Sequence, residues 1–189
     1  AEMERGIAEE ARRASERLIQ AIARSSPDWI YVFDMDRMAS TYMNRAILSE
    51  FGHADDEATP YLSVDVFRRL MPVAEMPHLI RILDEWRELP DGRIREDEYL
   101  LGHADGTFRW LMGRETVFAR RPDGSARQIL GSLYDITERK KITENLRRAE
   151  SRHRAMLMSS LDGVVLMAAD GAILEFSPAA ETIFGYRQE

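Results

Sequence analysis

Apolar residues recur at helical spacing near the start of the sequence. Between residues 2 and 25 they fall three or four positions apart, with Glu and Arg between them, which predicts one amphipathic helix. The apolar positions of this stripe are Met3, Ile7, Ala11, Ala14, Leu18 and Ala21. Much of the stripe is alanine, so it suits contact with another helix better than a place in a deep core. Pro27 disfavours a helical residue before it, so the helix should end there.

Short apolar runs bounded by turn residues replace this periodicity in the middle of the sequence. Strands are predicted at residues 29–33, 39–43, 93–103, 107–119 and 126–135, and helices at 45–51, 64–70 and 75–89. Asp105-Gly106 and Asp123-Gly124 join the last three strands, and Asp-Gly pairs favour tight antiparallel hairpins. The predicted fold class is therefore α+β, with a five-stranded antiparallel sheet, helices on one face and a long connector helix at each end.

The last predicted strand runs directly into a second long helix, over residues 137–160. Asp135 and Thr137 are both candidates for its N-cap, because a short side-chain oxygen can accept a hydrogen bond from an amide of the first turn. A change in the strand could then move the helix. We therefore predict that Asp135, Thr137 and a partner on the neighbouring strand, Arg109, relay a signal. The alternative is that Asp135 only caps the helix.

A heptad-like stripe on the second long helix predicts that it pairs with another helix. Its positions, spaced by four, three, four and three residues, are Ile142, Leu146, Ala149, His153 and Met156. Charged residues flank the stripe, and we expect two copies of the chain to form a homodimer along it. Two heptads are short for a coiled coil, and the alternative is a helix that packs back on its own sheet.

The end of the sequence repeats part of its first half. Ser25-Ser-Pro-Asp28 matches Ser159-Ser-Leu-Asp162, and residues 44–53 match residues 177–186, with Phe-Gly near the end of each. The predicted organisation is an N-terminal helix at 1–25, a complete domain at 26–136, a connector helix at 137–160 and the incomplete start of a second domain at 161–189. Because two strands rarely form a stable sheet alone, this last segment lacks most of its own core.

Three motifs in the first domain resemble the PAS domain family, the sensory modules of many bacterial signalling proteins. Residues 135–140, Asp-Ile-Thr-Glu-Arg-Lys, resemble the exit of that domain into its helix. Glu98-Tyr99-Leu100 and residues 104–111 resemble its paired central strands, and residues 121–124 resemble the hairpin that follows. The segment after residue 160 resembles the start of a second PAS domain.

The resemblance implies a sensory and dimerisation module of a bacterial signal-transduction protein. Binding of a ligand or partner would be relayed through the helix after Asp135-Ile136-Thr137 to an output domain outside this chain, such as a histidine kinase or a domain that turns over cyclic-di-GMP. The segment itself is expected to be non-catalytic. The alternatives are a ligand-free scaffold for protein–protein interaction and a redox or light sensor with bound flavin or haem.

Composition narrows the classes of partner. The net charge of −7 gives no support for nucleic acid as a partner. The absence of cysteine excludes disulfides, thiolate metal sites and cysteinyl–flavin photochemistry in this segment. No apolar run approaches the roughly 20 residues that span a bilayer, so no membrane segment is predicted and the chain is expected to be cytoplasmic.

The histidines do not form a predicted metal site. His53, His78, His103 and His153 lie in separate predicted elements, and none has a second histidine four residues away. His78 lies near the region from which haem-binding PAS relatives supply an axial histidine, but too early in the helix. An ordinary packing or surface histidine is therefore favoured. The sequence requires no cofactor, leaves a small-molecule ligand open and argues against haem and flavin.

The space between the sheet and its helices is the candidate binding site, since ligand pockets are concave and mostly apolar. Its predicted lining is Phe33, Tyr42, Leu79, Leu83, Tyr99, Trp110, Met112 and Ser132. A shift of one residue in strand phase would exchange these positions for their neighbours. The favoured alternative is that these large side chains simply fill the core.

Overall fold

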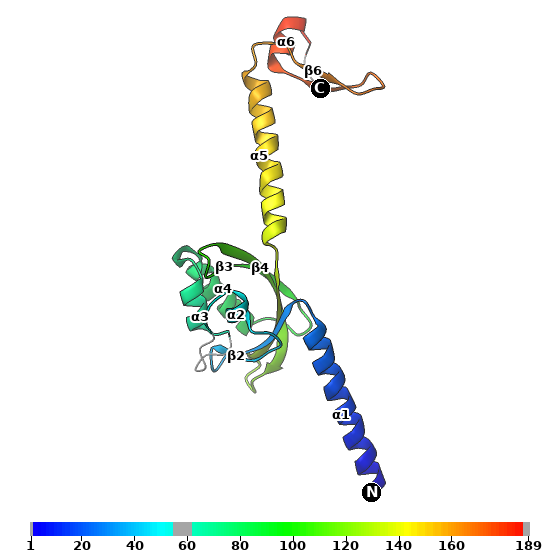
Figure 1. Cartoon of the computed structure of the whole chain (residues 1–189), viewed down its shortest axis with the longest axis vertical. Coiled ribbons are helices and arrows are strands. Elements are labelled where there is room, and N and C mark those ends of the chain that lie inside the picture. Colours follow the sequence, from blue (N-terminus) through cyan, green and yellow to red (C-terminus); the bar gives the residue numbers. More distant parts are fainter. Residues whose placement is uncertain (1, 55–61, 187–189) are drawn as a thin grey trace. The chain divides into compact units, whose positions relative to one another are not determined.

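A computed structural model of the chain describes residues 2–54 and 62–186, and the side chains of residues 9–54 and 62–186. The chain divides into two compact units, Ala1–Thr137 and Glu138–Glu189. The first unit holds α1, the strands β1 to β5 and the helices between them. The second holds most of α5, followed by a short hairpin and α6 (Figure 1).

The first unit is built on one five-stranded antiparallel sheet in the order β2-β1-β5-β4-β3. The strands are β1 (Trp29–Asp34), β2 (Ala39–Met43), β3 (Arg95–Gly102), β4 (Phe108–Arg120) and β5 (Ala126–Asp135). Pairing of β1 with β5 places the first strand beside the last one. The α+β fold class predicted from the sequence is confirmed, including the number of strands and their antiparallel sense.

Short helices cover one face of this sheet (Figure 1). They are α2 (Ile47–Glu50), α3 (Val64–Leu70), the 3-10 turn Val73–Glu75 and α4 (Met76–Arg87). The buried side of α4 carries Leu79, Ile82, Leu83 and Trp86. Trp86 meets Phe33 of β1 at a ring-centroid distance of 5.5 Å, so α4 packs directly on the sheet.

The two predicted Asp-Gly hairpins are present and use the same local hydrogen bonds. Gly106 and Gly124 have φ angles of +84° and +87°, which glycine adopts at little cost. The carboxylate of Asp105 accepts hydrogen bonds from the amide and hydroxyl of Thr107, at 2.8 and 2.6 Å. Asp123 accepts the same pair from Ser125, at 2.9 and 2.7 Å. These turns hold β3, β4 and β5 in register.

Helix α1 (Glu2–Ser25) contacts the sheet domain through its last turns. Among residues 9–25, Ala23 is buried, whereas Leu18, Ile19 and Ile22 are largely exposed. The side-chain amide of Asn44, the residue after β2, donates to the carbonyl of Ala23 at 2.7 Å and so ties the helix end to the sheet domain. The apolar stripe predicted for this helix is therefore uncovered at Leu18; Met3 and Ile7 lie outside the described side chains.

The second unit reproduces the start of the first. After α5 (Thr137–Ser159) come β6 (Val165–Met167), β7 (Ile173–Phe176) and α6 (Pro178–Phe184). In the first unit, the side-chain oxygen of Asn44 accepts a hydrogen bond from the backbone amide of Ile30. The backbone amide of Asn44 donates to the carbonyl of Ile30. Ser177 makes the same two bonds to Val164, so the sequence repeat is also a structural repeat.

Burial distinguishes the two copies. Phe51 at the end of α2 is 3% exposed, whereas Phe184, its counterpart at the end of α6, is 56% exposed. The glycine after each has nearly the same φ angle, +73° at Gly52 and +74° at Gly185. The local fold of the repeat is therefore present twice, but only the first copy has a core around it.

Candidate functional site

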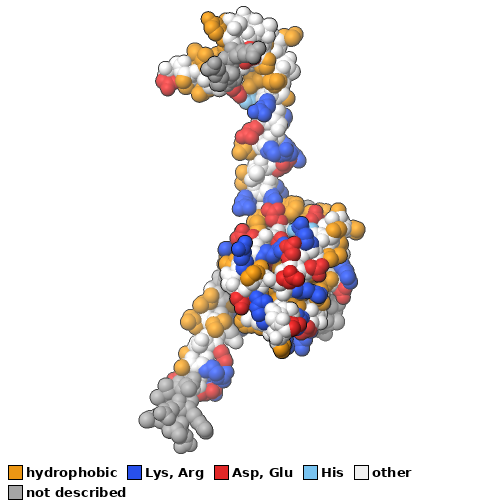
Figure 2. Space-filling view, turned by 180° about the vertical axis from the view of Figure 1, so that it is seen from behind, with side chains coloured by type: hydrophobic (Ala, Val, Ile, Leu, Met, Phe, Trp, Pro, Cys, Tyr) orange, Lys and Arg blue, Asp and Glu red, His pale blue; other side chains and the backbone are white. Residues whose placement is uncertain are grey.

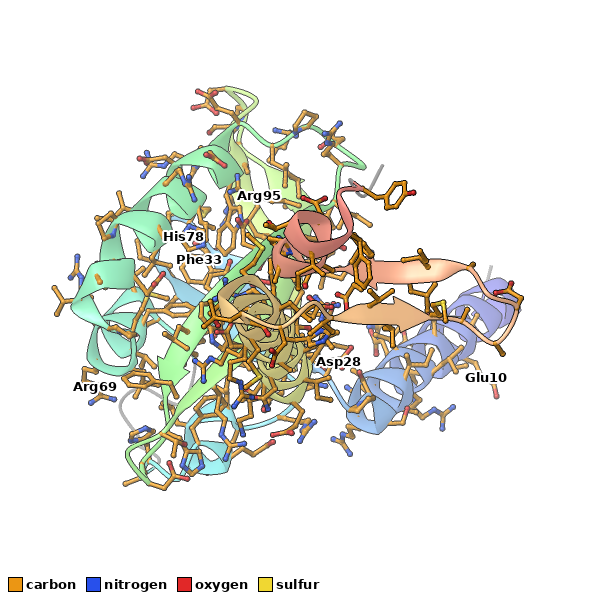
Figure 3. The ribbon with its side chains drawn as sticks, turned by 90° about the horizontal axis from the view of Figure 1, so that it is seen from above. Glu10, Asp28, Phe33, Arg69, His78 and Arg95 are labelled. Carbon is orange, nitrogen blue, oxygen red and sulfur yellow. The ribbon has the colours of Figure 1, made fainter. Side chains whose placement is uncertain are left out.

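The eight pocket candidates divide between the two faces of the sheet. Phe33, Leu79, Leu83 and Tyr99 are buried in the core between sheet and helices. In Figure 3, Phe33 lies on this helical side of the sheet. The four candidates that share this space are packed against one another and their neighbours. Their role as ligand contacts remains a prediction.

The other four candidates lie on the opposite face. Leu111, Gly113 and Glu115 are the buried residues of β4, so Trp110 and Met112, which alternate with them, face outward. Ser132 pairs with Ile30 and Arg114 on that same outer face. Tyr42 pairs with Val32 there and is 39% exposed. The strand phase assumed from the sequence was therefore wrong by one residue for β4, and Tyr42 and Ser132 also lie outside the core.

A hollow of about 300 Å³ lies on the outer face of the sheet. It is lined by apolar side chains that include Ile30, Ile94 and Leu130, with Ser132 and Arg114 among its polar groups. Of the eight candidates, Ser132 is the one that lines it. The structure thus does not gather the predicted set into one pocket.

A buried acid, Glu115, occupies the core at a position that sequence reasoning did not single out. It is 0% exposed, and its Oε1 accepts hydrogen bonds from the hydroxyls of Tyr31 and Tyr99, each at 3.0 Å. Its other oxygen, Oε2, has no hydrogen-bond partner among the described residues. An acid in alternation with Leu111 and Val117 of one strand is the signal that could have revealed it.

Two glycines make room for this cluster. A Cβ atom at Gly131 would lie 2.3 Å from Cζ of Tyr31, and one at Gly113 would lie 2.2 Å from Oε1 of Glu115. Real Cβ atoms do not approach other atoms so closely. Glycine at both positions therefore allows the Tyr31 ring to pack over the neighbouring strand β5 and the Glu115 carboxyl to pack over its own strand β4.

Burial dominates the electrostatics of the cluster. Loss of water raises the pKa of Glu115 to about 8, opposed by the two tyrosine hydroxyls that stabilise the carboxylate. The charge of Asp97 raises it further, and Arg95 lowers it. Burial and the neighbouring Glu115 also raise the pKa of both Tyr31 and Tyr99 well above the usual range. The raised pKa therefore favours the protonated carboxyl at neutral pH.

Charged residues next to the cluster are already paired. Arg95 holds both carboxylate oxygens of Asp97, its Nη2 donating to Oδ1 at 2.9 Å, and also contacts Glu85 of α4. Figure 3 shows Arg95 on β3 at the side of the sheet domain. Because Arg95 already faces two carboxylates, it offsets only part of the effect of burial on Glu115.

Two hydrogen bonds anchor the strand-to-helix junction to β4, and a third lies within the junction. The amide of Ile136 donates to the carbonyl of Trp110 at 2.8 Å, and the amide of Trp110 donates to Oγ1 of Thr137 at 2.9 Å. Oδ1 of Asp135 accepts from the amide of Thr137 at 2.7 Å. Asp135 thus caps the first turn, whereas the Thr137 hydroxyl reaches back to the sheet. Both Ile136 and Thr137 are buried.

The predicted partner of Asp135 lies nearby but is loosely paired. Nη1 of Arg109 is 3.9 Å from Oδ2 of Asp135, at the outer limit for an ion pair. Among the described residues, Nε of Arg109 is a buried nitrogen with no hydrogen-bond partner. The relay role of Asp135, Thr137 and Arg109 remains a prediction.

The predicted seam on α5 is open to solvent in the single chain. Ile142, Leu146 and Met156 are 67%, 59% and 68% exposed, and Ala149 and His153 are exposed as well. Within the second unit, Nε2 of His153 lies 3.7 Å from Oε2 of Glu175. Charged side chains of α5 pair with one another beside the seam, as Arg147 and Arg148 do with Glu144.

Histidine chemistry and surface charge add no further site. Nε2 of His78 lies 3.1 Å from the carbonyl of Glu98, and its Nδ1 lies 2.6 Å from a nitrogen of Arg81, so both ring nitrogens are engaged. Across residues 2–54 and 62–186, no three His, Asp or Glu side chains are placed to hold a metal ion. On the face seen in Figure 2, acidic and basic side chains are intermixed over the first unit.

Comparisons with known proteins agree with this geometry. In structure, the chain resembles a sensory box histidine kinase/response regulator from Burkholderia thailandensis, with a TM-score of 0.54 and 18% identity over 74% of this chain and 97% of that one. An RNA-binding light-oxygen-voltage receptor gives a TM-score of 0.53 and 18% identity over 72% of this chain and 37% of that one. These likenesses concern the fold.

A curated relative in sequence is the sensor protein FixL of Bradyrhizobium diazoefficiens, 29% identical over 119 residues. The matched region is 58% of this chain but only 23% of that protein, so the chain spans less than a quarter of its relative. None of the helices in the described parts of the chain is long and apolar enough to cross a bilayer.

The fold and junction define a small single-sheet α+β module whose last strand continues into a helix. A family model described as PAS domain matches residues 17–95 and again residues 151–189, together well over half of the sequence. The chain therefore belongs to the PAS domain family, and the second match falls on the repeated segment.

Proposed function

We propose that this chain is the sensory and dimerisation module of a longer bacterial signal-transduction protein. Binding of a ligand or partner to the sheet domain is relayed through the helix after Asp135-Ile136-Thr137 to an output domain outside this chain. The similarity to sensor proteins supports this assignment, since one structural relative is described as a histidine kinase/response regulator and one curated relative as a sensor protein.

The junction between β5 and α5 is the observation that carries the proposal. One residue separates the last strand from the first helical residue, and that short segment is bonded to Trp110 on β4 through both Ile136 and Thr137. A shift of β4 relative to β5 must therefore break these bonds or move the first turn of α5. A ligand shifts this equilibrium only by its different affinity for the two arrangements.

We propose that two copies of the chain pair along the exposed seam of α5. Exposed leucine and isoleucine at heptad spacing, flanked by charged residues, are typical of such pairing. The test is Leu146→Glu, which places a charge in the seam, measured by light scattering over a range of protein concentrations. The mass should fall from dimer to monomer.

Asn145→Glu is the matched control, because it adds the same charge one position away on the same exposed helix. Its mass should remain that of the unaltered chain. A monomer for the unaltered chain, or a dimer that survives Leu146→Glu, would remove the seam from the proposal.

A ligand-free interaction scaffold is the second candidate function. The packing of Phe33, Leu79 and Tyr99 into one core favours it, since predicted pocket positions there are filled by side chains. Mass spectrometry of small molecules released on denaturation separates the two functions. A stoichiometric released compound favours the ligand sensor, and its absence together with unchanged dimerisation in the presence of metabolites favours the scaffold.

A further inference from the structure

Glu115 is a fully buried titratable group for which the junction and seam give no role. It lies on β4, paired across the sheet with Arg95 of β3 and Gly131 of β5. We propose that the proton on Glu115 is a signal that this module reads, so that loss of the proton loosens the β4–β5 pair that carries the junction. This inference rests on the sensory function proposed above, and it identifies the proton as the ligand that the module senses.

The surroundings of Glu115 favour one protonation state strongly. One carboxyl oxygen receives both tyrosine hydroxyls, and Oε2 has no hydrogen-bond partner among the described residues. A neutral carboxyl tolerates this arrangement, whereas an ionised one would leave a charged, buried oxygen without a hydrogen-bond partner among the described residues. The core would then have to move or admit water.

The charged and titratable groups that face Glu115 do not remove this conflict. They are Tyr31 from β1, Asp97, Tyr99 and Arg95 from β3 and, through Arg95, Glu85 from α4. The nearest cation, Arg95, is held by Asp97 and Glu85, and Asp97 itself repels a second negative charge. Burial therefore outweighs the two hydroxyls, and the pKa of Glu115 rises to about 8.

The position of Glu115 connects it to the junction. Glu115 and Trp110 lie on the same strand, and Gly131, opposite Glu115, is four residues before Asp135 on β5. The Tyr31 ring packs against Gly131 and donates to Glu115, so it touches both strands of this pair. If Glu115 or Tyr31 moves when Glu115 loses its proton, the movement displaces β4 and β5. These are the two strands whose ends position Ile136 and Thr137.

The sign of the pH effect follows from the raised pKa. A carboxyl in an unfolded chain releases its proton near pH 4.3, whereas Glu115 in the folded chain keeps it up to about pH 8. Its contribution to stability is therefore fully present below the unfolded value and is lost as pH rises through 8. One proton corresponds to a change of at most about tenfold in the unfolding equilibrium constant per pH unit.

The test compares the chain with its Glu115→Gln variant, in which an amide of similar size replaces the neutral acid. The urea midpoint is measured from pH 6 to pH 9, and the carboxyl is titrated by carbon-13 NMR. Between pH 6 and 8 the unfolding constant of the unaltered chain should rise by several-fold to tenfold per pH unit relative to Glu115→Gln. Glu96→Gln, an exposed acid on the neighbouring strand, should follow the unaltered chain.

Coupling to the junction is read in the same samples by hydrogen exchange at the amide of Ile136. The exchange ratio between the unaltered chain and Glu115→Gln should increase with pH, because the comparison at each pH cancels the intrinsic pH dependence. Parallel stability profiles, a carboxyl midpoint below pH 6, or a constant ratio at Ile136 would each overturn the proposal. Failure of Leu146→Glu to dissociate the dimer would instead affect the seam and leave this titration intact.

If Glu115→Gln does not fold, Tyr99→Phe gives an independent reading. It removes one hydroxyl that stabilises the carboxylate, so the NMR midpoint of Glu115 should move upward. Tyr134→Phe is the control, since Tyr134 pairs with Met112 on the outer face of the sheet. An unchanged midpoint in Tyr99→Phe would overturn the proposal as well.

Discussion

At the scale of single residues, the core of this domain depends on where side chains are missing. Glycine inside a strand weakens it, unless another group approaches closely at that point. Gly131 and Gly113 are such points, because the ring of Tyr31 and the carboxyl of Glu115 occupy the space where a Cβ would be. The buried acid is therefore bonded to two tyrosine hydroxyls, and two glycines leave the space that this cluster occupies.

Gly131→Ala should destabilise the domain by about 1–3 kcal/mol, the usual cost of overpacking. The added methyl would lie 2.3 Å from Tyr31, so the ring must move and its hydrogen bond to Glu115 is strained. Urea unfolding at pH 6 measures the loss. In a Tyr31→Leu background the same Ala should cost clearly less, since the ring is gone. An equal cost in both backgrounds would place the strain elsewhere.

The residue scale is also where sequence reasoning reached its limit. In β4 the large apolar side chains Trp110 and Met112 lie on the outer face, and the inner face carries Gly113 and Glu115. Periodicity assigns the apolar set to the core, so it selected the wrong phase. Only tertiary contacts, the two hydroxyls that reach Glu115, show why an acid and a glycine face inward.

At the scale of elements, turns and helix ends were readable because their chemistry is local. Both Asp-Gly hairpins and the junction at Asp135 were predictable, since each depends on residues within a few positions. The division of roles at the junction was not, because Thr137 bonds to Trp110, 27 residues earlier. The structure thus adds a hydrogen bond between α5 and β4 to what was expected to be a simple cap.

Thr137→Val tests that bond between α5 and β4 with little change of shape. It removes the acceptor of the Trp110 amide in a buried place, so stability should fall by about 1–2 kcal/mol. The hydrogen exchange of Trp110 should also become faster. Both are measured beside Thr143→Val, whose hydroxyl donates to the carbonyl of Arg139 on the exposed surface of α5.

The control substitution should change stability by less than about 0.5 kcal/mol, as surface changes usually do. If the two valine variants lost the same stability, the hydroxyl of Thr137 would matter only for helix formation, and the anchoring of the junction to β4 would be refuted.

At the scale of the whole molecule, the chain contains one local unit twice, with a core around only the first. Every member of the buried hydrophobic cluster lies between Trp29 and Leu133. In the second copy, Leu166, Ile173 and Phe184 are about half exposed. A two-stranded hairpin is marginally stable in water, so hydrogen bonds alone do not fix this copy.

Two matched amides within the same chain make this difference measurable. The Ile30 amide donates to the side chain of Asn44 at 2.7 Å, and the Val164 amide donates to that of Ser177 at 2.9 Å. The local bond is equivalent, but the opening of Ile30 requires disruption of a packed core. Hydrogen exchange at Val164 should therefore be faster by several orders of magnitude, because protection follows the free energy of local opening.

Removal of residues 161–189 should leave the urea midpoint of the first unit unchanged, since the buried cluster contains none of them. Exchange at Ile30 and Val164 is measured in the full chain at two concentrations tenfold apart. Similar slow exchange at both amides would show that the apolar side chains of the second copy are buried by another surface in solution. If that protection fell on dilution, the surface that buries them would belong to a second copy of the chain. The second unit would then take part in the dimer together with the seam of α5.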